Sequence, residues 1–281
     1  MSTAEKLNYL LETKNQIRNA IEEKGVSIAD TDSFRSYASK IGQIESGDST
    51  TDAFWNARTN GGTDGEGLFA YASKEICENA DFLNFVENMD TSRMKSFKYM
   101  FQLSNFTELD FSNWDMSAAN NIGHMFYYTS LIKIDISSWN LNDFKSLDYF
   151  CYSSSNLTEI NLSNCDTSSV ITMSSAFMYC SKLTKILGIL DFSETTGLYG
   201  VFGSVASNSP KLLEEVRIKN LNKTGLNLSY CTALSYDSLI YLINNLVETT
   251  TAKTVSLGSE NLAKLTQEEI AIATEKGWTL A

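Results

Sequence analysis

The chain has 281 residues, of which 43% are hydrophobic, so it can bury a large core and its composition does not suggest disorder. Its 22 basic and 34 acidic residues give a net charge of −12. Without basic clusters, this balance argues against nucleic acid and against membrane surfaces as partners. No apolar run approaches ~18 residues, so no membrane-spanning helix is predicted. The five cysteines form no CxxC pair, and we predict no metal and no other cofactor.

Residues 1–45 are predicted to form a small helical module for attachment or oligomerisation. Ser2 and Glu5 fit a capping box, and the expected helices cover residues 3–24 and 33–41. The apolar face of the first helix keeps heptad spacing over a short stretch. It predicts either a coiled-coil contact between copies of the chain or a face that packs on the second helix.

Residues 46–67, which are rich in Gly, Ser, Thr and Asp, are predicted to form a linker. After it, a five-residue motif recurs along the chain, of which Asn113-Trp114-Asp115-Met116-Ser117 is one copy, and we call this motif the phrase. The central residues of the phrase are Asp90, Asp115, Asn140, Asp166 and Asp191, which lie 25 or 26 residues apart. A period in this range is typical of leucine-rich repeats, whose units must stack to bury their apolar faces. We therefore predict that residues 68–281 form an α/β leucine-rich-repeat solenoid with a parallel β-sheet, short helices and a C-terminal cap.

Each repeat is expected to contain a short helix or 3₁₀ turn that ends in a Met-Phe-like pair, then a loop, and then a strand. The expected strands cover residues 107–112, 132–137, 158–163, 184–187 and 215–219. Apolar and polar residues alternate in these strands, which predicts one face in the core and one in solvent. The cap is expected to contain a helix at 235–247, a strand at 253–257 and a helix at 266–276.

The Asp or Asn of each phrase is predicted to cap the next helix or to close an Asx turn, without a metal ion. Beside it runs an apolar ladder of Met89, Trp114, Trp139, Cys165 and Leu190, which predicts core positions. The alternative is that Trp114 and Trp139 are exposed and serve as aromatic platforms for sugars.

Two segments of the sequence illustrate a family resemblance that extends over about residues 80–235. They are Met125-Phe126 followed by Leu131-Ile132-Lys133-Ile134-Asp135-Ile136, and Ala176-Phe177-Met178-Tyr179-Cys180-Ser181-Lys182-Leu183-Thr184. These segments resemble the BspA-like leucine-rich repeat. The opening of the chain, between Leu10 and Ile41, is similar to a short helical module of phage tail and baseplate proteins. The resemblance implies a surface for binding or adhesion, with no shared catalytic residues.

The outward-facing ends of the first three expected strands form a polar strip that could bind a sugar or a protein loop. The polar strip consists of Asp110, Ser112, Asp135, Ser137, Asn161 and Ser163. Like charges on adjacent strands cost stability, so the pairing of Asp110 with Asp135 lacks a local folding reason. We interpret the strip as the ligand-binding site, with solvated filler as the alternative. Replacing Asp110, Asp135 and Asn161 together by Ala should then abolish binding and leave melting nearly unchanged.

The enzyme hypothesis is weak, because His124 is the only histidine and occupies the repeat position of Tyr99 beside the Met-Phe pair. We expect a non-enzymatic, phage- or prophage-associated structural and binding protein that recognises a host, a glycan or a protein. Its partners could include phage tail components and, through the N-terminal helix, a second copy of the chain. The alternatives are an adhesin-like bacterial repeat protein and, because the repeat face is acidic, a carbohydrate-active enzyme.

The expected location follows from the start of the chain, where we see no secretion signal. We therefore expect the protein in a virion, or in the cytoplasm before assembly. The bacterial cell surface is the alternative.

Overall fold

The computed structural model describes residues 14–15, 17–23, 28 and 65–281. Residues 14–15 and 17–23 are helical, within the first predicted helix. Ile17 and Ile21 of this helix are buried. The second predicted helix and the linker up to residue 64 lie outside the described residues.

From Gly65 onward the chain is mixed α/β, with a four-stranded parallel sheet and short helices. The sheet has the order β1-β2-β3-β4, and its strands are Lys133–Asp135, Glu159–Asn161, Lys185–Asp191 and Glu215–Lys219. Two helices precede it, α4 (Lys74–Cys77) and α5 (Ala80–Glu87). The elements that follow it are α6 (Tyr236–Asn244), β5 (Lys253–Val255), α7 (Gly258–Leu262), α8 (Gln267–Glu275) and β6 (Trp278–Leu280). β5 pairs with β6 in a second parallel sheet.

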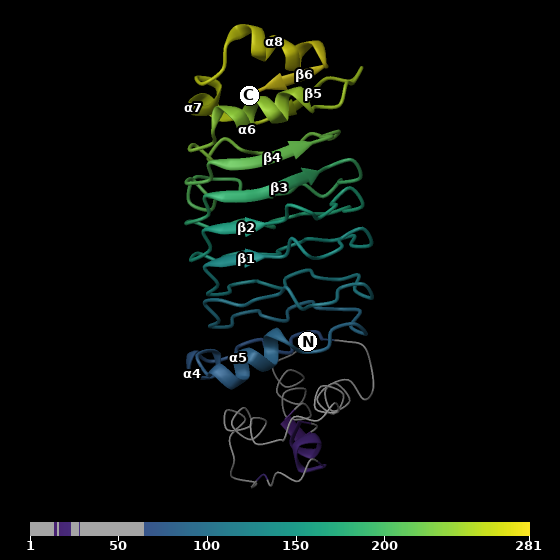
Figure 1. Cartoon of the computed structure of the whole chain (residues 1–281). Coiled ribbons are helices and arrows are strands. Elements are labelled where there is room, and N and C mark those ends of the chain that lie inside the picture. Colours follow the sequence, from purple (N-terminus) through teal and green to yellow (C-terminus); the bar gives the residue numbers. More distant parts are fainter. Residues whose placement is uncertain (1–13, 16, 24–27, 29–64) are drawn as a thin grey trace, which may run out of the picture.

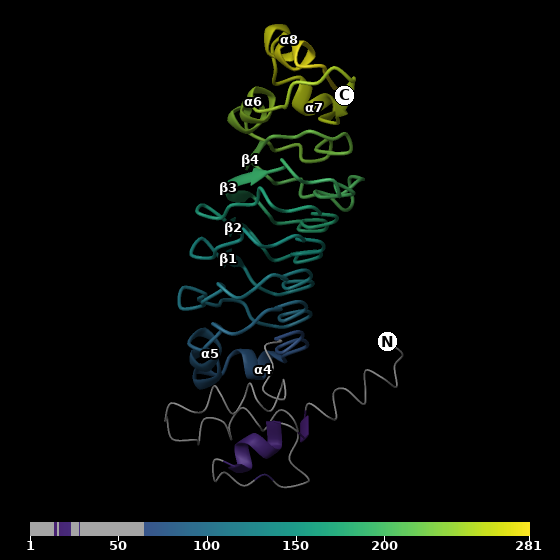
Figure 2. The same cartoon turned by 90° about the vertical axis from the view of Figure 1, so that its right-hand side faces the viewer.

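The chain winds in successive turns that lie one on another in sequence order, from α4 and α5 at one end to α8 at the other (Figure 1). We call each of these turns a coil and the whole arrangement the stack. Seen at right angles, β1 to β4 lie along one side of this stack (Figure 2). Lys133, Glu159 and Lys185 are partners in register on adjacent strands. The Lys133 amine lies 3.3 Å from the Glu159 carboxylate. Four of the expected strands are thus confirmed, although β1 and β2 are shorter than expected.

The first expected strand, residues 107–112, does not form. Its backbone accepts one hydrogen bond from the β1 side, from the N–H of Ile132 to the carbonyl of Thr107 (3.0 Å). On the other side the N–H of Asp110 donates to the Glu87 carboxylate of α5 (3.0 Å). The strand prediction was wrong here because a helix offers no row of free backbone groups with which a strand can pair.

The short helices expected before the strands are tight turns instead. In the coil at residues 97–104, the N–H groups of Phe97, Tyr99, Phe101 and Leu103 donate to carbonyls of the next coil. The N–H groups of Met100, Gln102 and Ser104 donate to carbonyls three residues back within their own coil. Tyr99 and Leu103 have φ angles of 61° and 55°. This left-handed backbone interrupts a helix but lets alternate residues bond to the neighbouring coil.

The core is a single cluster of buried side chains that runs through the whole stack. Phenylalanines of neighbouring Met-Phe-like pairs contact each other: Phe101 stacks on Phe126 with ring centroids 5.7 Å apart, whereas Phe126 meets Phe150 edge-on at 5.2 Å. Trp114 and Trp139 are only 4% and 2% exposed and stack on each other at 6.1 Å. The prediction of core positions is confirmed, and exposed tryptophan platforms for sugars are ruled out.

The predicted Asx turns form at all five phrases. In each, the backbone N–H two residues on donates to the Asp or Asn side chain, at 2.8 to 3.0 Å. These bonds satisfy backbone donors at points where the chain leaves a strand or turns. They explain the recurrence of Asp and Asn by local backbone geometry.

Asp191 nevertheless does not belong with the other four phrases, because it ends β3 and does not follow it. Gly188, with φ of 98°, bends this strand, and the register against β4 jumps from Ile186 to Ile189. A Cβ at Gly188 would lie 2.5 Å from the Leu162 carbonyl oxygen, so only glycine fits. The irregularity moves Asp191 into the strand-end position, and the prediction based on even spacing was wrong there.

The C-terminal cap contains the expected elements with slightly narrower bounds. α8 begins with a capping box, in which Thr266 and Glu269 bond each other's backbone N–H groups. The Lys276 amine donates to the carbonyl of Asn244 at the end of α6 (2.6 Å), which joins the two helices. Within the part of the chain that the structure describes, every helix is too short or too polar to cross a bilayer.

Candidate functional site

The polar strip lies at the sheet edge, and its side chains bond to one another. Asp135 and Asn161 are partners in register on β1 and β2, and the Asn161 amide donates to the Asp135 carboxylate (3.0 Å). Asp110 lies in the segment that is not a strand. The backbone N–H groups of Ser112, Ser137 and Ser163 donate to the Asp or Asn two residues before them, at 2.9 to 3.1 Å. The strip therefore uses much of its hydrogen-bonding capacity to close turns.

The electrostatics of Asp135 agree with this structural role. Partial burial by itself raises the pKa of the carboxyl group, but hydrogen bonds from Ser137 and from the Asn161 amide outweigh it. The net pKa is lower than usual, so the carboxylate is stabilised as the charged acceptor of these bonds.

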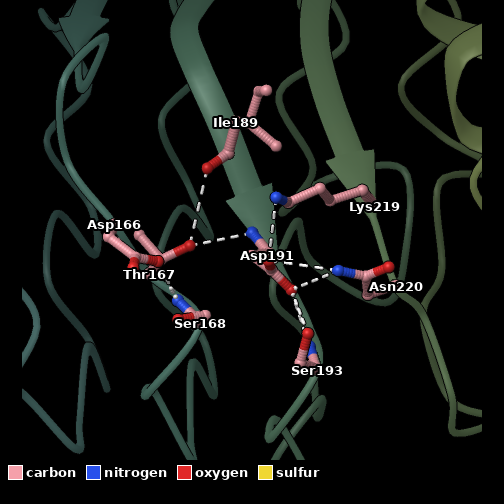
Figure 3. A network of polar contacts seen from close by, with 8 residues as sticks. All are labelled: Asp166, Thr167, Ser168, Ile189, Asp191, Ser193, Lys219 and Asn220. Carbon is pink, nitrogen blue, oxygen red and sulfur yellow. Dashed lines mark hydrogen bonds and ion pairs between the residues drawn. The ribbon is translucent and has the colours of Figure 1, made fainter.

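The strip continues at Asp191, where the same pattern is buried. The Asp191 carboxylate accepts from the backbone N–H of Ser193 (3.0 Å) and from the Asn220 amide (3.0 Å), and its other oxygen lies 3.0 Å from the Lys219 amine. Its backbone N–H donates to the Thr167 hydroxyl (2.8 Å). Figure 3 shows these groups converging on Asp191 from the neighbouring coils. Asp191 is only 5% exposed, so this network joins coils and is not open to a ligand.

A second surface is formed by tyrosines of the tight turns, and we call it the tyrosine ledge. Its members are Tyr71, Tyr99, Tyr127, Tyr128, Tyr149, Tyr152 and Tyr179. The rings of Tyr127 and Tyr152 stack at 5.1 Å with an angle of 5° between their planes. Tyr128 lies 4.9 Å from Tyr127, and Tyr179 lies 5.3 Å from Tyr152. From Tyr99 to Tyr179 the ledge thus crosses several coils as one group of rings, in which the His124 ring joins Tyr99 to Tyr149.

The most outward rings of the ledge are well exposed to solvent. Tyr71, Tyr128 and Tyr179 are 62%, 45% and 39% exposed. Their backbone is also unusual, because all three residues have left-handed φ angles between 55° and 64°. Tyr99 and Tyr149 share this conformation, which costs on the order of 1–2 kcal/mol for a residue with a side chain.

The fold does not require tyrosine at these left-handed positions. The same turn positions are held in other coils by Gly67, Ser153, Ser175 and Gly200, all with φ between 56° and 66°. Glycine would adopt this backbone at no steric cost. Strained residues that gather on one surface without a need of the fold point to a function of that surface.

The ledge is electrically neutral at its centre. Burial raises the pKa of Tyr127 and Tyr152, and the neighbouring tyrosines raise it further. His124 lies between the rings of Tyr99 and Tyr149, 4.7 Å from each. Burial lowers the pKa of His124, Lys98 lowers it further, and Asp148 opposes the shift. The phenols of Tyr127 and Tyr152 and the imidazole of His124 are therefore uncharged at neutral pH.

Metal binding and thiol chemistry have no visible site in the described part of the chain. Among the residues that the structure describes, no three His, Cys, Asp or Glu side chains lie close enough to hold a metal ion. All five cysteines are buried and free. Burial raises the pKa of Cys165, Cys180 and Cys231 to about 12, so these thiols stay protonated.

A family model matches residues 69–160 and again residues 151–237, which together cover more than half of the chain. The chain belongs to this family, described as Mycoplasma protein of unknown function, DUF285. Both DUF285 matches lie in the stack and include the coils that carry the ledge and the strip. Comparison with curated proteins found no match, and comparison with solved structures found none either.

The tyrosine ledge was not predicted from the sequence, although its tyrosines recur close to the Met-Phe-like pairs. Tyr99 directly precedes the pair Met100-Phe101, Tyr149 is the first residue of the pair Tyr149-Phe150, and Tyr128, Tyr152 and Tyr179 each follow the Phe of their pair by two residues. In the structure, Tyr71, Tyr99, Tyr128, Tyr149 and Tyr179 take the left-handed positions of the turns.

Proposed function

We propose that this protein is a non-enzymatic binding protein, built as a leucine-rich-repeat solenoid, whose tyrosine ledge contacts a macromolecular partner. One observation carries the proposal. Exposed tyrosines in left-handed backbone gather on one surface, at turn positions that glycine or serine fills elsewhere. Tyrosine offers a large, rigid contact surface at low cost in side-chain entropy. It is enriched at the centres of interfaces, from which charged residues are depleted.

The solenoid part of the proposal is supported by the way the coils repeat. Alternate N–H groups of the turns bond to the next coil from residue 67 to residue 179. The strands are parallel, and one core cluster continues through all coils. A stack of this kind buries the apolar face of each unit against its neighbours, which is the architecture of the BspA-like repeats that the sequence resembles.

We further propose a phage or prophage setting, with the protein in a virion and its N-terminal module attached to tail components. This part is supported by the resemblance of the first 45 residues to phage tail and baseplate modules. The alternative, an adhesin-like protein on the bacterial surface, would use the same ledge. Neighbouring genes distinguish them: tail or lysis genes favour the virion, whereas an exporter or sortase gene favours the cell surface.

The binding function is tested with fluorescently labelled full-length protein and a panel of bacterial cells. The test variant carries Tyr71→Gly, Tyr128→Gly and Tyr179→Gly, which removes three rings and relieves their left-handed backbone. We expect cell binding to fall about tenfold or more, as for loss of central interface residues. Tyr236→Ala, at an exposed tyrosine of α6 outside the ledge, serves as the control. If wild type and the triple variant bind equally, the ledge is not the binding surface.

A further inference from the structure

We propose that the ligand of the tyrosine ledge is a neutral polysaccharide that lies along the stack across several coils. The inference rests on the proposed binding function of the ledge and goes further by naming the chemistry of the partner. Three properties of the ledge support it: backbone N–H groups that are already bonded, a mainly uncharged surface, and exposed rings that recur along the stack.

The backbone of the ledge is not available to a partner. The N–H groups of Tyr99 and Tyr128 donate to carbonyls of the next coil, at 3.3 and 2.8 Å, and that of Tyr152 donates to Tyr149 within its own turn (3.2 Å). The N–H groups of the other four ledge tyrosines are bonded in the same two ways. A peptide therefore cannot add to this surface as a further strand, which is a common way of binding an extended peptide. Only rings and phenol hydroxyls remain for recognition.

The ledge also offers little charge to a charged ligand. The groups whose electrostatic effect reaches Tyr127 and Tyr152 are all tyrosines. The two charged groups near His124 have opposite signs: the Lys98 amine lies 4.8 Å from the ring centre of Tyr99, and the Asp148 carboxylate accepts from Thr172 and Ser174. With a net charge of −12, the chain repels polyanions at long range. These properties favour an uncharged ligand.

Sugars match the groups that remain. The face of a phenol ring carries negative electron density, on which the weakly positive C–H groups of a pyranose ring can pack. The phenol hydroxyls can donate to and accept from sugar hydroxyls. The exposed rings of Tyr71, Tyr128 and Tyr179 recur at every second coil, with Leu103 and Ser153 at the same position in between. Adjacent strands of a parallel sheet lie about 4.8 Å apart. A surface with a short repeat suits a polymer with a short repeat.

The first test is retardation of the native full-length protein in gels that contain a soluble polysaccharide. The neutral probes are dextran, laminarin, yeast mannan, galactan and arabinoxylan, and the acidic probe is polygalacturonate. We expect retardation by at least one neutral probe and none by polygalacturonate. The Tyr71→Gly, Tyr128→Gly, Tyr179→Gly variant should lose about tenfold or more of the affinity. The matching Tyr→Phe variant, which keeps the rings, should lose less.

Three outcomes of the gel experiment would overturn the inference. They are no retardation by any neutral probe, equal retardation by polygalacturonate, and equal retardation of wild type and glycine variant. Because each variant is also examined by circular dichroism, a folding defect is not mistaken for a loss of binding.

A second experiment separates failure of this inference from failure of the binding function. Bacterial cells that bind the wild-type protein are treated either with periodate, which cleaves sugar diols, or with a protease. Loss of binding after periodate alone supports the polysaccharide. Loss after protease alone would show that the ledge binds a protein, so the binding function would stand and the polysaccharide would not. If untreated cells bind no protein at all, the binding function itself fails.

Discussion

Two ladders of side chains follow the stack, and they use their polar and aromatic groups in opposite ways. On the polar strip, the Asp and Asn side chains accept from the serine two residues on, and Asn161 also donates to Asp135. On the tyrosine ledge, rings contact other rings, while Tyr71 and Tyr128 still expose much of their surface. The strip is satisfied within the chain, whereas the ledge is not.

This difference separates what the stack needs from what it carries. An Asp or Asn recurs at the strand ends because the turn there needs an acceptor for a backbone N–H. The ledge positions hold Tyr, His, Leu, Ser or Gly while the turn geometry stays the same. Residues that vary at a fixed backbone position, and that strain it, are not explained by the fold.

The largest expected effect on stability is that of Asp191→Ala, at the buried end of the strip. The change leaves the Asn220 amide and the Lys219 amine without their acceptor. We expect the free energy of unfolding to fall by about 2–3 kcal/mol, measured by denaturant unfolding. The control is Asp166→Ala, an exposed residue with the same bond to its Ser168 N–H, which should cost about 0.5 kcal/mol. Equal losses would contradict the role given to Asn220 and Lys219.

The next effect compares the two ladders directly, in a variant with Asp110, Asp135 and Asn161 all replaced by Ala. The turns lose three acceptors at exposed or half-exposed sites, so we expect a total loss of about 1–2 kcal/mol in stability. Cell binding should not change, because the ledge is untouched. The sequence-based hypothesis expects the reverse, loss of binding with unchanged melting. That result would return the site to the strip.

The parallel sheet could be predicted from the sequence because two simple signals agreed, the spacing of the phrases and the alternation of apolar residues. The bounds of β4 and the core positions of Trp114 and Trp139 follow from them. The failed strand at 107–112 depends on its neighbour α5, and the position of Asp191 depends on one glycine in β3. Both are tertiary effects that no local pattern contains.

The ledge was not predictable for a different reason. Left-handed positions are normally recognised by Gly or Asn, and here tyrosine, histidine and leucine occupy them. The sequence therefore indicated short helices in place of these turns. Asp135 and Asn161 end strands as expected, whereas Asp110 lies in a segment that forms no strand, and the side-chain bonds of the strip could not be inferred from spacing alone.

A smaller effect on stability is expected for the triple glycine variant of the ledge. Glycine relieves the left-handed strain at residues 71, 128 and 179, whereas loss of the rings removes some contacts. We expect stability to be unchanged or to rise by up to about 1 kcal/mol, while binding is lost. Ser153→Gly relieves the same backbone without removing a ring, so it should keep binding. A clear loss of stability in the triple variant would mean that the rings hold the stack together.

The smallest expected effect is the pH dependence of the stability that Asp191 contributes. Burial by itself raises the pKa of Asp191, but bonds from Ser193, Asn220 and Lys219 hold it below its ordinary value of 3.8. The folded state therefore binds protons less readily than the unfolded state. The stabilisation is complete above the ordinary value and is lost as the pH falls through the folded pKa. Comparing wild type with Asp191→Asn, we expect their difference in stability to be constant from about pH 7 to 5 and to shrink by about 1 kcal/mol or less below about pH 4.

The ledge should not share this dependence, and the contrast sharpens the comparison. The pKa of His124 is lowered and the pKa values of Tyr127 and Tyr152 are raised, so all three groups are neutral at pH 7 and slightly above it. We therefore expect the affinity for cells to be constant between about pH 7 and 9. Titration of binding across this range, with the Tyr236→Ala control, measures it. A change in affinity within this range would contradict a contact made by uncharged rings.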